Sequence, residues 1–354
     1  MPAPLRRPTW LEAMLCFFPL ALVVELAGGP PVAVFALSAA AIVPLAGYMG
    51  RATEELASHA GPAVGGLLNV TFGNATELII AFVALRANKL DVVKASLTGS
   101  IIGNLLLVLG LSMLAGGLRR REQHFSTKAA STYNSLMVVA IIGMIIPALF
   151  VYAGGGEGPL ESISLGVSVL LLAVYALAMV FSLHTHKHLF NPLVGEEEVH
   201  AHWSRRKAVL VLALSAVLVA VLSELLVGSL DGVTASLGLK DLFIGVVIVA
   251  IIGNAAEHGI AVTVAMKDKM DLSLNIATGS SAQVALFVAP LLVLVGYAIG
   301  SPMTLFFEVF ELAAMGLAVG AVIMVSQDGE SNWFEGAMLF SVWLMMAMVF
   351  YFHP

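Results

Sequence analysis

The sequence predicts an all-α polytopic membrane protein with 11 transmembrane helices, in which two inverted five-helix repeats follow one N-terminal helix. Three observations predict this fold class: an apolar composition, a series of long apolar segments and an internal duplication. Of the 354 residues, 59% are hydrophobic and 11% are charged, and the mean hydropathy is +0.97. A soluble domain carries about 25% charged residues. The composition therefore excludes a globular enzyme with a single membrane anchor.

Eleven apolar segments can be counted, and most have the roughly 20 residues that a helix needs to cross a bilayer core. They cover residues 10–26, 31–49, 61–85, 92–115, 131–152, 160–183, 208–230, 242–266, 272–299, 303–325 and 333–352. The first segment follows Arg6 and Arg7, as in a signal peptide, but it runs into ELAGGPP without a convincing small-x-small cleavage site. We therefore expect a retained helix. The single cysteine, Cys16, excludes an internal disulfide framework.

Positive charge predicts the orientation of the chain. With the N-terminus in the cytoplasm, most lysines and arginines lie in cytoplasmic loops, including residues 119–121 and 205–207. This arrangement follows the positive-inside rule, and an odd number of helices then places the C-terminus outside, most simply in a plasma (inner) membrane. We divide the chain into an N-terminal helix, a first repeat, a cytoplasmic linker rich in His and Glu, and a second repeat, at residues 1–28, 29–184, 185–207 and 208–354.

The duplication is visible in two polar motifs within apolar sequence. GNATELII at residues 73–80 and GNAAEHGI at residues 253–260 lie 180 positions apart. Without a gap, residues 73–103 and 253–283 are identical at 11 of 31 positions. Shared apolar composition does not place Asn, Glu, Lys, Asp and Thr-Gly-Ser in the same register, so the two halves are copies.

Each copy contains five predicted helices, and an odd number gives the two copies opposite orientations in the membrane. Inverted repeats are typical of secondary transporters, whose ion sites lie near the midplane where the repeats meet. Gly73 and Gly253 precede the polar groups and are expected to weaken each helix there. The sequence therefore predicts a site between the third and the eighth segments.

The duplicated polar residues predict a site that binds a cation or protons. Glu77 and Glu257 lie in apolar segments, where a charge costs about 3 kcal/mol or more. Asn74 and Asn254 precede them by three residues, hence on the same helix face. Other nearby oxygen donors are Ser100, Ser280, Gln283 and Asn104. Oxygen ligands suit a hard cation such as Ca²⁺. Burial and mutual repulsion favour protonation of two carboxylates when the cation leaves.

For several other residues, the sequence allows either a functional or a structural role. His258, whose counterpart in the first copy is Leu78, is either a proton relay or a packing partner of Glu257. Glu54 and Glu55 are expected just beyond the inner end of the second segment, as candidates for gating. Glu224 is expected deep in the seventh segment, as a further candidate for ion access.

The motifs GNATE and GNAAEH, followed by TGSIIGNLLLVLG and GSSAQVALFVAP, resemble the two signature repeats of the Ca²⁺/H⁺ exchanger (CAX) family of the cation/Ca²⁺ antiporter superfamily. The motif ATEELA after the second segment and LSELL in the seventh also match that family. The resemblance covers nearly the whole chain, from about Glu54 to Phe352. It implies an eleven-helix fold with two inverted repeats. It also implies that Glu77 and Glu257 bind the cation and exchange protons, with Asn74 and Asn254 beside them.

The same resemblance implies an acidic loop between the sixth and seventh segments, which Glu196, Glu197 and Glu198 match. We therefore expect this loop to be a candidate regulator of transport. The histidines nearby suggest a soft-metal cluster, but a solvated linker that is rich in histidine by coincidence explains them as well. They are His184, His186, His188, His200 and His202.

The resemblance implies a secondary antiporter that exchanges cytosolic Ca²⁺, or another divalent cation, for protons by alternating access. It implies no enzymatic activity and no cofactor. Its substrates would be Ca²⁺ and H⁺, and it would lie in the lipid bilayer. A homo-oligomer is left open by the sequence. No basic cluster suggests that it binds nucleic acid. One alternative is a Na⁺-coupled exchanger of the same superfamily, which needs additional acidic ion sites. The other is a membrane-embedded metalloenzyme, but His258 is the sole deep histidine. No GxxxxGK[ST] motif supports ATP as the energy source.

Overall fold

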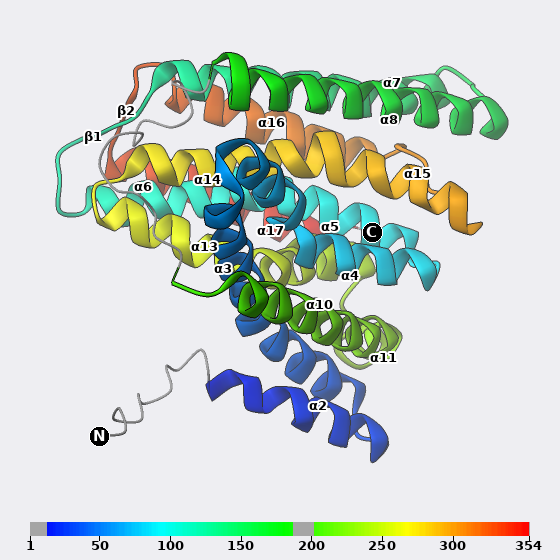
Figure 1. Ribbon diagram of the computed structural model, residues 1–354. Coiled ribbons are helices and arrows are strands. Elements are labelled where there is room, and N and C mark those ends of the chain that lie inside the picture. Colours follow the sequence, from blue (N-terminus) through cyan, green and yellow to red (C-terminus); the bar gives the residue numbers. More distant parts are fainter. Residues whose placement is uncertain (1–12, 187–201, 354) are drawn as a thin grey trace, which may run out of the picture.

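The structure is a computed structural model that describes residues 13–186 and 202–353, and it is built almost entirely of helices (Figure 1). The first half contains η1 (Met14–Cys16), α2 (Phe17–Leu26), α3 (Pro31–Phe72), α4 (Ala75–Arg86), α5 (Leu90–Ile102), η2 (Gly103–Val108), α6 (Leu109–Gly117), β1 (Gln123–His124), α7 (Thr127–Tyr152), α8 (Glu157–Val180) and η3 (Phe181–Thr185). The second half contains α10 (Arg205–Gly228), α11 (Leu230–Leu237), α12 (Asp241–Phe243), η4 (Ile244–Val249), α13 (Ala250–Met266), α14 (Met270–Gln283), η5 (Val284–Val288), α15 (Ala289–Ile299), α16 (Val309–Val325), β2 (Glu330–Ser331) and α17 (Trp333–Phe352).

Within the described residues, eight helical stretches are long and apolar enough to cross a membrane. They are Pro31–Ala60, Leu90–Gly117, Thr127–Tyr152, Glu157–Thr185, Arg205–Gly228, Asp241–Met266, Met270–Ile299 and Trp333–Phe352. Two shorter apolar helices, Met14–Leu26 and Val309–Val325, correspond to the first and tenth predicted segments. The remaining predicted segment, residues 61–85, is not one helix, because α3 ends at Phe72 and α4 begins at Ala75.

Helix α3 joins two stretches that the sequence predicts as separate segments. It has 42 residues and would be about 63 Å long if straight, twice the thickness of a bilayer core. A β-carbon on Gly65 would lie 2.7 Å from the backbone oxygen of Ala57, whereas eight residues span about 12 Å in a straight helix. The helix therefore bends sharply, as the blue ribbon in Figure 1 shows. Gly61-Pro62 lies between these positions, and proline is a usual cause of such kinks.

The continuous helix α3 changes the expected position of Glu54 and Glu55. Both residues lie inside α3, not beyond its end, because residues 50–60 are helical. This stretch contains good helix formers and has no glycine or proline between Arg51 and Ala60. The expectation that Glu54 and Glu55 lie just beyond the inner end of the second helix was therefore wrong.

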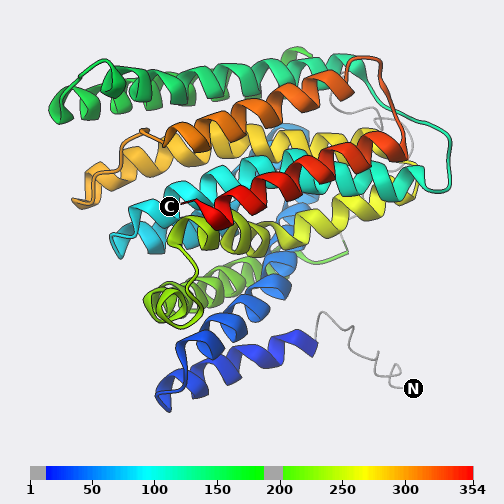
Figure 2. The same ribbon diagram turned by 180° about the vertical axis from the view of Figure 1, so that it is seen from behind.

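The most enclosed part of the bundle is the continuous helix α5–η2–α6. Within the most apolar 18 residues of Leu90–Gly117, 89% are buried, against 22% in the stretch that contains α8. Helix α17 packs along α6 on the face that Figure 2 shows, while α7 and α8 form an outer pair. The central helix is thus shielded on every side, and it carries residues that the sequence places in the site.

Matching turns reflect the duplication in the backbone. Asn88 between α4 and α5 and Asp268 between α13 and α14 have φ angles of 56° and 64°, and they are 180 positions apart. The left-handed conformation favours Asn and Asp among residues that carry a side chain. A two-stranded antiparallel sheet, β1 with β2, joins the chain before α7 to the chain before α17.

Candidate functional site

The structure brings together the two glutamates of the duplicated motif. Glu77 lies in the first turn of α4, and Glu257 lies in α13, one turn after Gly253. A β-carbon on Gly253 would lie 3.1 Å from Cγ of Glu77, so the absence of a side chain there admits the glutamate. Glu77 thus packs directly against α13, the helix that carries Glu257. Residues 180 positions apart therefore form one acidic pair.

The pair contains two buried oxygens that lack partners. Oε1 of Glu77 and Oε2 of Glu257 are shielded from solvent and have no hydrogen-bond partner within the described parts of the chain. No lysine or arginine there forms a salt bridge with either carboxylate. An unpaired buried charge is costly, so the pair is stable when it is protonated or when it binds a cation.

The helix around Glu77 is interrupted, as the sequence suggested, whereas the helix around Glu257 is not. Asn74, with φ −96° and ψ 26°, separates α3 from α4, directly after Gly73. By contrast, α13 runs through Gly253 without a break, and its distortion lies earlier, in the π-helical segment η4. The expected weakening of the helix is therefore found in one copy only.

Amide and hydroxyl groups surround the acidic pair. The hydroxyl of Ser280 on α14 donates to Oδ1 of Asn74 at 2.9 Å, and Nδ2 of Asn74 donates to Oε1 of Gln283 at 2.5 Å. In the related arrangement of the other copy, Nδ2 of Asn254 donates to Oγ of Ser100 at 3.0 Å. Each asparagine therefore bonds a serine of the opposite half.

Asn104 on η2 connects these two sets of hydrogen bonds. Its Nδ2 donates to Oγ of Ser280 at 3.1 Å and to Oδ1 of Asn254 at 3.5 Å. Its Oδ1 faces Nε2 of His258 at 3.1 Å. Since Oδ1 can only accept, His258 is a donor in this contact. His258 therefore contacts the network through Asn104.

A void of about 10 Å³ lies beside Glu77, which is close to the space that one water molecule needs. Ser100 and Gly253 line it, and so does Ser96, whose hydroxyl donates to the carbonyl of Val93. Ser96 was missed in the sequence because the repeat aligns it with Ile276, which removes the signal of a matched polar pair.

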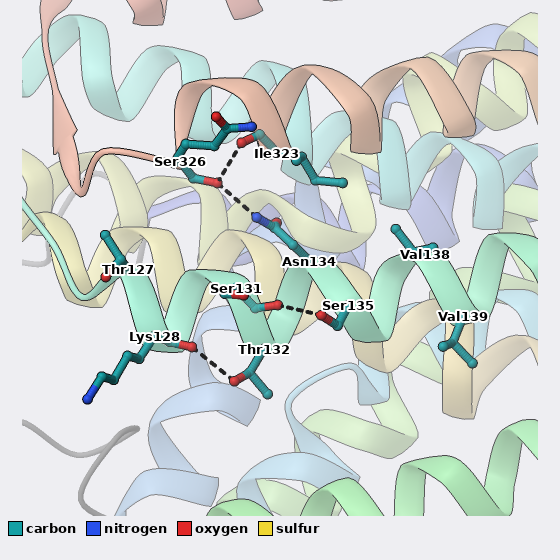
Figure 3. A pocket seen from close by; sticks show the side chains of 11 residues that line it. Thr127, Lys128, Ser131, Thr132, Asn134, Ser135, Val138, Val139, Ile323 and Ser326 are labelled. Carbon is teal, nitrogen blue, oxygen red and sulfur yellow. Dashed lines mark hydrogen bonds between the residues drawn. The ribbon is translucent and has the colours of Figure 1, made fainter.

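A groove on another part of the bundle lies away from the acidic pair. It measures about 890 Å³ and lies between the start of α7 and the end of α16, where Asn134 donates to Ser326 at 2.8 Å (Figure 3). Hydroxyl residues such as Ser131 and Ser135 line it together with Lys128. None of the residues that the sequence predicts for the cation site lines this groove.

The three gating candidates lie outside the network of hydrogen bonds. Glu55 is buried and accepts from the backbone N–H of His202 at 2.7 Å and of Trp203 at 2.9 Å, so it attaches α3 to the chain before α10. Glu54 is exposed on the same helix. The expectation that Glu224 lies deep was wrong: its side chain is 59% exposed and pairs with Arg86 at 3.5 Å near the end of α10. Position along a segment does not reveal which face of the helix is covered.

The acidic linker residues Glu196, Glu197 and Glu198 lie outside the described residues. The same holds for His188 and His200. In the described part of the chain, no group of three or more His, Cys, Asp or Glu side chains is arranged to hold a metal ion.

Comparison with known proteins finds related sequences along both halves of the chain. The profile of the family described as sodium/calcium exchanger protein matches residues 30–184 and 207–352, one range in each half. A Ca²⁺/H⁺ antiporter of Synechocystis sp. is 49% identical, over 96% of this chain and 96% of that protein. The Ca²⁺/H⁺ antiporter ChaA of Bacillus subtilis is 44% identical, over 94% and 96%.

Among solved structures, native YfkE superimposes with a TM-score of 0.86 at 40% identity, covering 97% of this chain and 100% of that one. The described part of this chain has eight helical stretches that are long and apolar enough to cross a membrane. The chain is therefore an integral, multi-pass membrane protein, and the resemblance that its motifs suggested is confirmed. With both halves matched by the same profile, the chain belongs to the sodium/calcium exchanger protein family.

Proposed function

We propose that this protein exchanges Ca²⁺ for protons across the membrane by alternating access. The observation that carries the proposal is the pair Glu77 and Glu257, in which each carboxyl group has one buried oxygen without a partner among the described residues. Ser96 and Ser100 line the void beside Glu77, and within the described residues no lysine or arginine forms a salt bridge with either glutamate. The relatives that share 49% and 44% of the sequence are Ca²⁺/H⁺ antiporters.

The chemistry of the pair supports a competition between one divalent cation and protons. Two ionised carboxylates neutralise Ca²⁺, and two protonated carboxyls are neutral without it, so both loaded forms avoid an uncompensated charge in the membrane. The form with two bare carboxylates is the costly one. If the site rarely changes from one side of the membrane to the other without a bound cation or protons, the flux of Ca²⁺ is coupled to the flux of protons.

The neighbouring residues have proposed roles of their own. Asn74, Asn254, Ser100 and Ser280 are proposed oxygen ligands of the cation once their mutual hydrogen bonds rearrange. Asn104, Gln283 and His258 are proposed to hold these side chains in position through hydrogen bonds. Ca²⁺ would contact six to eight oxygens, which two carboxylates alone do not supply.

For the whole chain we propose 11 transmembrane helices, with residues 1–28 as the first helix, 29–184 and 208–354 as inverted repeats, and 185–207 as the cytoplasmic linker. The two family matches, one in each half, and the paired turns at Asn88 and Asp268 support the repeats. The distribution of lysine and arginine supports an N-terminus in the cytoplasm and location in the plasma membrane.

A Na⁺-coupled exchanger is less well supported. Additional monovalent ions need additional carboxylates, and the network beside Glu77 and Glu257 contains amides, hydroxyls and one histidine. The residues that carry the hydrogen bonds of the network suit proton exchange better than they suit several sodium ions.

The test is transport by the purified protein in liposomes with an imposed pH gradient. We expect Ca²⁺ uptake that requires the gradient and stops when a protonophore collapses it. Gradients of Na⁺ or K⁺ at uniform pH should not replace it. Uptake driven by a Na⁺ gradient alone would favour the Na⁺-coupled alternative.

A further inference from the structure

Another buried carboxylate, Glu311, lies outside the acidic pair. It is in the first turn of α16 and is only 3% exposed. One oxygen accepts from the backbone N–H of Glu308 at 3.0 Å, which completes a capping box at the start of α16. The other oxygen accepts from the hydroxyl of Thr98 on α5 at 2.9 Å. A capping box needs only one of these two bonds, so the bond to α5 requires a separate explanation.

Thr98 lies on the helix that forms one wall of the site. On α5, Ser96, Leu97 and Ser100 line the void beside Glu77, whereas Thr98 is fully buried against α16. A residue two positions away lies about 200° around the helix. The bond from Thr98 to Glu311 therefore acts on the side of α5 that is opposite Ser100.

Both oxygens of this carboxylate are held by hydrogen bonds, one from the hydroxyl of Thr98 and one from the backbone N–H of Glu308. Lys94 lies one turn before Thr98 on α5, with its Nζ 5.8 Å from the centre of the Phe306 ring. Within the described residues, the two bonds distinguish Glu311 from Glu77 and Glu257, which each keep one buried oxygen without a partner.

The duplication provides an internal comparison. Thr98 corresponds to Thr278 on α14, at the offset of 180. Thr278 is equally buried, but its hydroxyl donates to the carbonyl of Leu274 on its own helix at 2.7 Å. The positions that correspond to Glu311 and Lys94 hold Ser131 and Leu274. The bond between helices is therefore a property of one half, and the shared fold does not require it.

We propose that Glu311 is a positioning residue for cation binding, which acts through Thr98 to hold α5 so that Ser100 and Ser96 face Glu77. This inference rests on the proposed function, because it assigns a role in the same site. Without the bond, α5 is free to rotate or shift away from α16, and the oxygens on its opposite side lose their alignment with Glu77.

The experiment compares Thr98→Val with its matched control, Thr278→Val. Both replace a buried threonine by an isosteric residue, but only the first removes a bond between helices. We expect Thr98→Val to raise the KM for Ca²⁺ by about fivefold or more, as loss of a buried hydrogen bond predicts. We expect Thr278→Val to change KM by less than about twofold. Thr98→Ser, which keeps the hydroxyl, should restore a KM close to that of the wild type.

A second measurement separates positioning from folding. The purified variants are heated with and without Ca²⁺, and the stabilisation by Ca²⁺ should shrink for Thr98→Val and persist for Thr278→Val. Equal effects of the two valine variants on KM would overturn the inference, as would an unchanged KM in Thr98→Val. If wild-type protein failed to exchange Ca²⁺ for protons, the proposed function would fall, whereas the comparison of Ca²⁺-dependent stability would still test the positioning role.

Discussion

At the scale of single residues, the molecule combines two kinds of buried carboxylate. Both oxygens of Glu311 are satisfied by hydrogen bonds, whereas Glu77 and Glu257 each keep one oxygen free within the described structure. A satisfied buried carboxylate holds its surroundings in place. An unsatisfied one gains free energy by binding a proton or a cation. This difference supports a structural role for Glu311 and exchange for the pair.

The free oxygens lead to the first prediction. Glu77→Gln and Glu257→Gln should each abolish Ca²⁺/H⁺ exchange, because glutamine keeps the size of the side chain but cannot ionise. Both variants should remain folded, with elution on size exclusion and a thermal unfolding midpoint close to those of the wild type. Proton-driven Ca²⁺ uptake at the normal rate by either variant would contradict a shared site.

At the scale of helices, the site depends on close backbone contacts. Gly99 on α5 packs against η4 so tightly that a β-carbon would lie 2.0 Å from the backbone oxygen of Val246. One turn later, Gly103 has no neighbour within 4 Å of the same position. Only the first glycine is therefore required for the contact between these two elements.

This contrast gives a stability prediction. Gly99→Ala should destabilise the protein by about 1–3 kcal/mol, because the backbone of α5 or η4 must move to accept the methyl group. Gly103→Ala should be neutral or slightly stabilising, since alanine favours a helix over glycine by up to about 1 kcal/mol. Thermal unfolding midpoints of both variants in detergent check this. Equal midpoints would show that α5 and η4 are not held by this contact.

The linker also belongs to the scale of elements, although Glu196, Glu197 and Glu198 lie outside the described residues. Three adjacent acids repel one another, and a bound cation relieves that repulsion. We predict that replacing all three by Gln leaves transport intact but changes its dependence on cytosolic Ca²⁺. The check is a Ca²⁺ titration of the initial rate in oriented vesicles. Superimposable curves for the wild type and the triple variant would leave the linker as a connection only.

At the scale of the whole molecule, the two halves meet at the proposed site. Every side-chain hydrogen bond of the network described above joins a residue of one half to a residue of the other. Motion of one half relative to the other would therefore rearrange the proposed ligands of the cation. A ligand shifts such an equilibrium only by binding the two states with different affinity.

One shared site predicts competition between Ca²⁺ and protons. Raising the proton concentration should raise the apparent KM for Ca²⁺ on the same side of the membrane, without lowering the rate at saturating Ca²⁺. The measurement is a series of initial rates in liposomes at several pH values, each over a range of Ca²⁺ concentrations. A fall in the maximal rate at constant KM would indicate separate sites.

The fold class and the acidic pair of this protein follow from patterns that are visible in the sequence itself. The apolar composition and the segment lengths determine a polytopic helical protein, because only helices and closed barrels satisfy the backbone in hydrocarbon. The repeated GNA-x-E motif identifies Glu77 and Glu257, since a matched pair of costly residues is not expected by chance in two apolar segments.

Tertiary structure decided which side chains meet. Ser96 lines the void beside Glu77 and Thr98 reaches Glu311, whereas Glu224 faces outward to Arg86. These outcomes depend on the rotation and crossing of each helix and on the bend of α3, which are determined by contacts between distant residues. Periodicity is local and assigns a residue to a helix, but the partner across the interface comes from the packing of the whole bundle.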